Sequence, residues 1–155
     1  MSPVRLWRLS AWLRRRGLVR TALLVKKLNS AIYHNSLAPG AEFAPDVRFE
    51  HHGFGTVIHS NVVIGKGVRI YQNVTIAVRA RTDSPHRIVI GDDVVIGASS
   101  VIISPAEGSL RIGSGARIGA GAVVAKDVPD GATVICAPPR VIVGEEAADA
   151  DQSGD

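Results

Sequence analysis

Apolar residues recur every six positions over much of the chain, from residue 58 onward. The leading aliphatic positions of this repeat are Ile58, Ile64, Ile70, Ile76, Ile90, Ile96, Ile102, Ile112, Ile118 and Val124. Small or aliphatic residues follow four positions later, at Val62, Val68, Val74, Val94, Ser100, Ala116, Ala122 and Val128. Neither the 3.6-residue period of a helix nor the two-residue period of an ordinary strand gives this spacing.

Six residues suffice for one short strand and a corner, so three such units close a triangular coil of about eighteen residues. Stacked coils bury their inward aliphatic residues against one another. The sequence therefore predicts an all-β fold, a parallel β-helix over residues 37–143, with a loop extruded at residues 77–89, where the repeat is interrupted. Residues 144–155 are polar and acidic, which predicts a flexible tail.

Residues 1–36 follow a helical pattern instead. Apolar residues stand at helix-like spacings at Leu6, Leu9, Trp12, Leu13, Leu18, Leu23, Leu24 and Leu28. The pattern breaks near Gly17. We therefore expect a short N-terminal arm of two amphipathic helices ahead of the β-helix.

The arm is strongly cationic, because residues 1–41 contain eight Lys or Arg and no acidic residue. The remainder holds ten basic and fourteen acidic residues. A cationic helix with Trp7 and Trp12 could make peripheral contact with an anionic membrane, or its apolar face could dock on the body or on a neighbouring subunit. Neither interleaved aromatics nor a recognition motif accompanies the charge, so nucleic acid is not an expected partner.

Composition also bears on the compartment. The single cysteine, Cys136, excludes an intramolecular disulfide and is typical of a reducing environment. Basic residues interrupt every apolar stretch of the N-terminal third before it reaches the length of a membrane span. We expect a cytoplasmic protein, with membrane contact limited to the surface.

The hexads "IGKGVR", "IGDDVV", "IGSGAR" and "IGAGAV", closed by "KDVPDGATV", resemble those of the left-handed β-helix acyltransferases of the hexapeptide-repeat family. The similarity is greatest to the serine acetyltransferase branch and covers roughly residues 37–143. The resemblance implies a left-handed β-helix, a homotrimer, an acetyl-coenzyme A co-substrate and active sites between neighbouring subunits.

Acyl transfer to an alcohol needs a base for the hydroxyl proton, and histidine is suited to that task. In "HHGFGTVI" the resemblance implies that His52 is the catalytic base and that His51 occupies an acceptor-side position. It also implies an orienting carboxylate, for which Glu42 aligns and Glu50 and Asp46 are alternatives. A surface histidine pair at a coil corner is the alternative for His51 and His52.

The family carries a second histidine near the acceptor in the extruded loop. His86 is its nearest counterpart here, followed by Arg87, although the surrounding order of residues differs from the family pattern. We expect both residues to bind the acceptor. A loop histidine without a role is the alternative.

The segments "IGASS" and "IGAGAVVAKDVP" resemble the family's donor segments. The resemblance implies that Ala98, Gly119 and Ala120 line the coenzyme A channel and that Lys126 lies near a phosphate. Small residues also occur at β-helix corners for steric reasons alone. The family's closing G-x-P-A-R appears as "CAPPR", with Cys136 in place of glycine.

These features predict an acetyl-coenzyme A dependent O-acetyltransferase without a metal, acting on a small-molecule or glycan hydroxyl, with a sugar or glycoconjugate favoured. Serine O-acetylation in cysteine biosynthesis is one alternative. A non-catalytic trimeric scaffold is a second. A zinc hydratase resembling the γ-class carbonic anhydrases is a third, although their His-x4-His pair is absent here.

Overall fold

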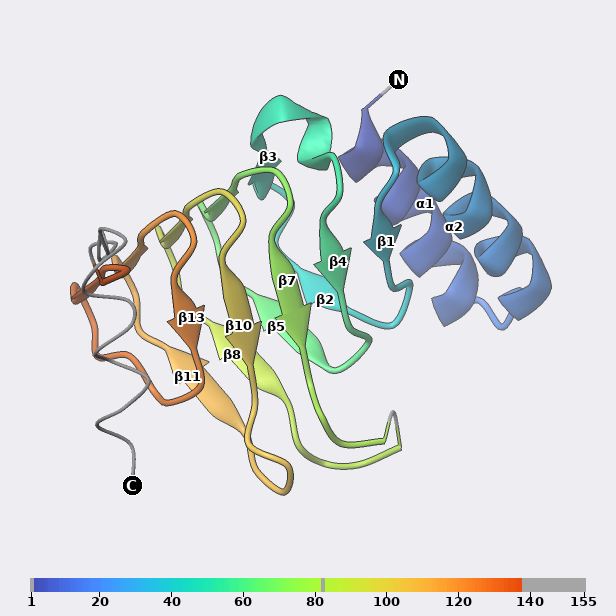
Figure 1. The fold of residues 1–155 in the computed structure, drawn as a ribbon. Coiled ribbons are helices and arrows are strands. Elements are labelled where there is room, and N and C mark those ends of the chain that lie inside the picture. Colours follow the sequence, from blue (N-terminus) through green and yellow to red (C-terminus); the bar gives the residue numbers. More distant parts are fainter. Residues whose placement is uncertain (1, 82, 138–155) are drawn as a thin grey trace, which may run out of the picture.

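The computed structural model describes residues 2–81 and 83–137. The predicted tail at 144–155 and the last part of the predicted β-helix, 138–143, lie outside the described residues. Two helices come first, α1 (Pro3–Arg15) and α2 (Val19–Tyr33), and short strands follow (Figure 1). The two predicted helices of the arm are thus confirmed, with Gly17 between them at a φ of +78°.

The strands form three parallel sheets. Sheet 1 contains β1 (Ser36–Leu37), β4 (Val57–Ile58), β7 (Thr75–Ala77), β10 (Val101–Ile103) and β13 (Val123–Val124). Sheet 2 contains β2 (Glu42–Phe43), β5 (Val62–Ile64), β8 (Ile88–Ile90) and β11 (Leu110–Ile112). Sheet 3 contains β3 (Arg48–Phe49), β6 (Arg69–Ile70), β9 (Val95–Ile96), β12 (Arg117–Ile118) and β14 (Thr133–Val134).

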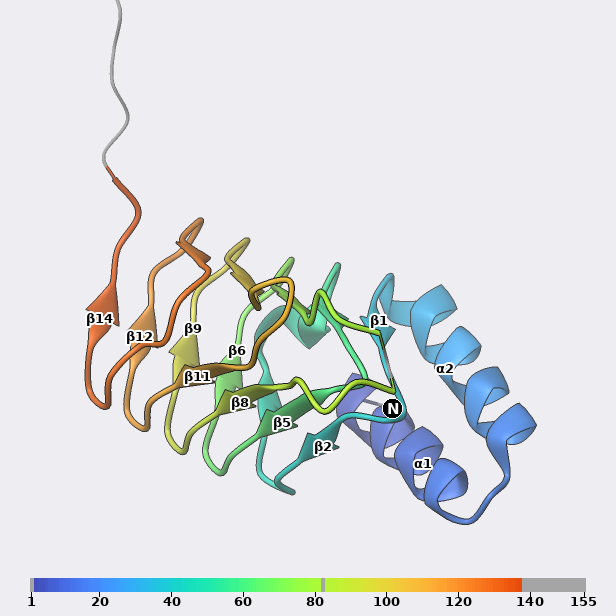
Figure 2. The ribbon, with the colours of Figure 1, turned by 90° about the horizontal axis from the view of Figure 1, so that it is seen from below.

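From β1 to β13 consecutive strands pass from sheet 1 to sheet 2 to sheet 3 and then return to sheet 1, so each set of three is one turn of a solenoid (Figures 1 and 2). In the last turn the bridge of Val128 to Ile112 takes the place of a strand in sheet 2. Equivalent residues of successive turns stand in register, as for Ile58, Ile76 and Ile102 in sheet 1. These side chains are at most 1% exposed. Each such burial contributes roughly 1.5–3 kcal/mol, so the six-residue repeat accounts for the core of the predicted parallel β-helix.

Helix α1 covers the open end of the solenoid, where the first turn has no turn beneath it (Figure 2). Trp7 is fully buried there. Its ring stacks on Phe43 at 3.8 Å between centroids and meets Phe49 at 5.8 Å. Its Nε1 donates a hydrogen bond of 2.8 Å to the carbonyl of Ala38. The docking alternative therefore holds for α1, which closes the end of the core.

The buried face of α1 differs from the predicted apolar stripe. Leu6 and Leu13 are buried as expected, but Leu9 and Trp12 remain 45% and 44% exposed. Trp7, outside the stripe, takes the central place because it stands above the aromatic rings of the first turn. Position relative to the solenoid, rather than hydrophobicity alone, decided which side of the helix is covered.

Helix α2 packs on α1 and also contacts β1, beside which it lies in Figure 2. Only Ala22 and Asn29 of this helix are buried. The side-chain amide of Asn29 donates to the carbonyl of Pro3 at 3.2 Å, which links the two helices. The two helices together, residues 3–33, are called the cap below.

Candidate functional site

Two long edges of the solenoid flank sheet 1. The histidine edge joins sheet 3 to sheet 1 through residues 50–56, 71–74, 97–100 and 119–122. The loop edge joins sheet 1 to sheet 2 through residues 38–41, 59–61, 78–87, 104–109 and 125–127. Figure 1 shows the first edge at the top and the extruded loops of the second at the bottom, with sheet 1 between them.

The histidine pair protrudes from the first corner of the histidine edge, in a short 3-10 turn at Glu50–Gly53. His51 and His52 both have left-handed backbone conformations, with φ of 48° and 59°. Two consecutive non-glycine residues in that region are uncommon and cost free energy, which favours a functional reason for the turn. Both side chains are exposed.

The two rings lie beside different neighbours. The centroid of His51 is 6.2 Å from that of Tyr71, in the next corner along the histidine edge. The centroid of His52 is 6.1 Å from that of Tyr33, at the end of α2. His51 thus faces along the edge and His52 faces the cap.

The predicted donor residues Ala98, Gly119 and Ala120 also belong to the histidine edge. Backbone hydrogen bonds join its corners into one column. Asn73 N donates to Phe54 O at 2.7 Å, Ser99 N to Gln72 O at 3.0 Å and Gly121 N to Ala98 O at 2.9 Å. The structure therefore brings the histidine pair and the three predicted donor residues to one side of a single chain.

The corner residues Gly97, Ala98 and Ala120 are small and closely packed. A Cβ at Gly97 would stand 2.6 Å from the backbone nitrogen of Ala120, so a larger residue would not pack there. The backbone N–H groups of Ala98 and Ala120 donate to no backbone acceptor among the described residues. Free amide donors beside small side chains suit a narrow amide-containing chain.

The predicted acceptor residues of the loop lie on the other edge. His86 is half-buried, and its carbonyl accepts a hydrogen bond of 3.1 Å from the side-chain amide of Asn61, which also binds Ser84 O at 3.1 Å. The guanidinium of Arg87 lies 3.5 Å from a carboxylate oxygen of Glu42. Asn61 therefore anchors the base of the loop.

Glu42 does not contact His52 within one chain, because it begins a strand of sheet 2 whereas His52 follows a strand of sheet 3. The width of sheet 1 separates them. Its proposed orienting role therefore stays a prediction. Glu50 is in the same turn as His51 and His52, and Asp46 instead binds the backbone N–H of Gly67 at 3.0 Å.

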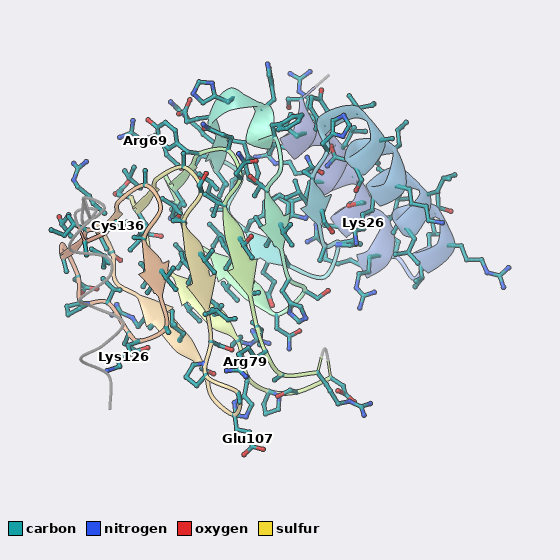
Figure 3. The ribbon with its side chains drawn as sticks, viewed as in Figure 1. Lys26, Arg69, Arg79, Glu107, Lys126 and Cys136 are labelled. Atoms are coloured by element: carbon teal, nitrogen blue, oxygen red, sulfur yellow. The ribbon has the colours of Figure 1, made fainter. Side chains whose placement is uncertain are left out.

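Lys126 follows β13 and lies on the loop edge, on the side of the molecule where Figure 3 labels Arg79 and Glu107. Within one chain it is therefore not beside Ala98, Gly119 and Ala120. For Lys126 to contact a phosphate of a coenzyme A molecule bound along these residues, it would have to come from a second chain. Lys126 lines a hollow of about 330 Å³ at the last turn.

Sequence reasoning did not single out Tyr71 or Asn61. Tyr71 stands directly after the hexad residue Ile70, a position that holds glycine after Ile64, Ile90 and Ile96. The same position holds His59, Ala77 and Ile103 in other repeats, so the aromatic ring of Tyr71 was the only available signal. No sequence signal marked Asn61, because its role depends on the distant loop that it binds.

The part of the chain that the structure describes contains no group of three His, Cys, Asp or Glu residues placed to hold a metal ion. Within residues 2–81 and 83–137, neither helix is both long and apolar enough to cross a bilayer.

The fold and its repeats define the class of the protein, a left-handed parallel β-helix built from hexapeptide repeats. No family model matches the sequence. Serine acetyltransferase of Synechococcus elongatus is 33% identical over 135 residues, which are 87% of this chain and 53% of the relative. The chain spans about half the length of the curated relatives it matches.

Solved structures agree with the sequence comparison. Soybean serine acetyltransferase complexed with serine has a TM-score of 0.78 and 30% identity, over 90% of this chain and 56% of that one. Serine acetyltransferase of Brucella abortus in complex with coenzyme A has a TM-score of 0.78 and 28% identity, over 90% and 54% of the two chains. These comparisons support the resemblance to the hexapeptide-repeat acyltransferases, in their serine acetyltransferase-like branch.

Proposed function

We propose that the protein transfers an acetyl group from acetyl-coenzyme A to the hydroxyl of L-serine. The observation that carries this proposal is the placing of the histidine pair and the donor residues Ala98, Gly119 and Ala120 on one edge of the solenoid. The similar proteins include serine acetyltransferases complexed with serine and with coenzyme A. These comparisons favour serine over the sugar acceptor expected from the sequence, for which they offer no support.

In the proposed reaction His52 accepts the proton of the acceptor hydroxyl while the hydroxyl oxygen attacks the thioester carbonyl. A carbon–oxygen bond forms, the carbon–sulfur bond breaks, and the leaving thiolate takes the proton from the imidazolium. His51, beside it, binds the acceptor. The free N–H groups of Ala98 and Ala120 hold the pantetheine arm along the histidine edge.

A homotrimer is part of the same proposal. The outward face of sheet 1 carries the ladder Val57, Thr75, Val101 and Val123. Val57 and Val123 are 40% and 68% exposed, so a flat apolar face lies between the two edges. Packing chains around a threefold axis can bring the loop edge of one chain to the histidine edge of the next.

Such packing would unite groups that one chain keeps apart. Glu42, His86 and Arg87 of one subunit would reach His52 of the next, and Lys126 would reach the donor channel.

We also propose a cytoplasmic location, which suits the exposed thiol of Cys136, with peripheral membrane contact through the cap.

An acetyl-transfer assay that measures release of free coenzyme A tests the reaction. L-serine should be acetylated, while N-acetylglucosamine and galactose should not. His52→Ala should lower kcat by about 10²–10⁴-fold, the usual loss for a general base. His51→Ala should mainly raise the KM for serine. His34→Asn, at an exposed histidine that also has a left-handed conformation, is the matched control and should keep full activity.

Other outcomes would point elsewhere. If His51→Ala is inactive and His52→Ala active, the base is His51, the residue that faces Tyr71. Acetylation of a sugar in place of serine would restore the glycan alternative. A chain that neither binds coenzyme A nor transfers acetyl would favour the scaffold, and stoichiometric zinc would favour the hydratase.

A further inference from the structure

The outer surface of the cap is unusually apolar for an exposed helical layer. The large apolar residues exposed on it, each between 44% and 67%, are Leu9, Trp12, Leu18, Val19, Leu23, Leu24, Leu28 and Ile32. Singly exposed apolar residues are ordinary, but a gathered set marks a surface that meets something else.

The cap carries eight basic residues and no acidic residue. Arg5 and Arg8 line a hollow with Asp46 and Glu50 of the first turn, whereas Arg20, Lys26 and Lys27 line a groove without an acidic side chain. None of the three ion pairs among the described residues includes a cap residue. The guanidinium of Arg16 lies over the ring of Trp12, 4.7 Å from its centroid, which keeps a cation beside an exposed aromatic. The surface around Arg16, Arg20, Lys26 and Lys27 is therefore cationic and apolar, and these cations form no ion pair among the described residues.

A groove of about 510 Å³ lies where α2 meets β1. Leu23 and Leu24 form its apolar wall, and the cations Arg20, Lys26 and Lys27 stand around it, with Lys26 labelled in Figure 3. Ser30 and Ser36 add hydroxyl groups. Cations and hydroxyls next to aliphatic side chains match a phosphate that is attached to a hydrocarbon chain.

Charge decides between the possible occupants. Two copies of this face would bring like charges together, which opposes self-association through the cap. An anionic bilayer surface attracts the cations and also buries the leucines and Trp12 at the level of the headgroups. We propose that the cap docks on anionic phospholipid and that the groove of Arg20, Lys26 and Lys27 takes a lipid phosphate. This inference rests on the peripheral contact proposed above and not on acetyl transfer.

Vesicle co-sedimentation of the full chain tests the proposal. The protein should bind vesicles of phosphatidylcholine that contain about one third phosphatidylglycerol, an anionic lipid. It should not bind vesicles of phosphatidylcholine alone. The triple variant Arg20→Gln, Lys26→Gln, Lys27→Gln should lower the partition coefficient roughly 100-fold, because each basic residue near the surface contributes about a fivefold factor. Raising the salt concentration should weaken binding of the natural sequence.

Sheet 3 offers a matched control that removes the same net charge elsewhere. Arg69 and Arg117 are exposed on its outer face, and Lys66 is exposed in the corner before β6. Among the residues that the structure describes, none of the three lines a hollow with a cap residue. The triple variant Lys66→Gln, Arg69→Gln, Arg117→Gln should change the partition coefficient by less than about threefold. Equal losses in both triple variants would mean attraction by net charge alone and would overturn the proposal.

Tryptophan fluorescence gives a second measurement. Trp7 is fully buried, whereas Trp12 is 44% exposed on the docking surface. Anionic vesicles should therefore shift the emission of Trp12 to shorter wavelength, and Trp12→Phe should remove the shift while co-sedimentation persists. An unchanged spectrum with the natural sequence would contradict insertion of the cap.

Two further results would contradict the proposal. Concentration-dependent self-association without vesicles that is lost in Leu24→Gln would show that a second copy covers the face. A rise in melting temperature with inorganic phosphate, combined with no vesicle binding, would mean that the groove takes free phosphate. Acetyl transfer measured without vesicles should be the same in the cap triple variant, so failure of one proposal does not imply failure of the other.

Discussion

Truncation of Trp7 should destabilise the whole β-helix rather than the helical arm alone. The side chain is fully buried, stacks on Phe43 and donates to the carbonyl of Ala38. Trp7→Ala removes the indole and leaves a cavity over the first turn. Buried Trp→Ala changes cost about 3–5 kcal/mol, a large part of the roughly 5–15 kcal/mol by which domains of this kind are stable.

The components of this cost can be separated. Trp7→Phe keeps a ring over Phe43 but leaves the carbonyl of Ala38 without its donor, and should cost about 1–3 kcal/mol. Trp12→Ala, at a half-exposed position on the same helix, should change the free energy of unfolding by less than about 0.5 kcal/mol. This ordering depends on burial and not on residue type.

Urea unfolding followed by far-ultraviolet circular dichroism measures these differences. The midpoint should fall for Trp7→Ala with an unchanged slope, since the solenoid and its cover unfold together. A loss below about 1 kcal/mol, or a separate first transition that removes helical signal alone, would refute the view that α1 completes the core. Hydrogen exchange at the strands of the first turn would then be unaffected as well.

Three further predictions concern the edges and the assembly. Asn61→Ala should free the loop that holds His86 and raise the KM for serine more than it lowers the melting temperature; an unchanged KM would speak against a loop role. Gly97→Val should weaken coenzyme A binding and stability together, by about 2 kcal/mol or more in unfolding, because its side chain would meet the backbone of Ala120. Val101→Glu should convert the proposed trimer to monomers in sedimentation while circular dichroism is retained, and an intact trimer would exclude the sheet 1 interface.

Much of the fold could be predicted from the sequence because a β-helix is built from local repeats. Residues six apart must occupy equivalent places in the coil, so Ile70, Ile76 and Ile96 identify the core without any distant contact. The extruded loop could also be predicted, because the segment between Ile76 and Ile90 is too long for a corner. Handedness followed from the family resemblance.

The histidine edge was only partly accessible to such reasoning. The repeat phase puts Ala98 and Ala120 after equivalent strands, so their shared edge follows from counting. The turn at His51 and His52 breaks that phase with additional residues. Which ring faces Tyr71 and which faces Tyr33 therefore depended on backbone conformations that the repeat does not specify.

By itself, then, the sequence determined the β-helix, its core and the residues of the small corners, since each follows from a period within the chain. Tertiary structure decided what lies across the coil. Glu42 and His52 are ten residues apart in sequence, yet the triangular turn assigns them to different edges. Trp7 rather than Trp12 became buried because the open first turn presents Phe43 and Phe49 to one side of α1. Such placements depend on the shape of the surface that a residue meets, and no local pattern encodes that shape.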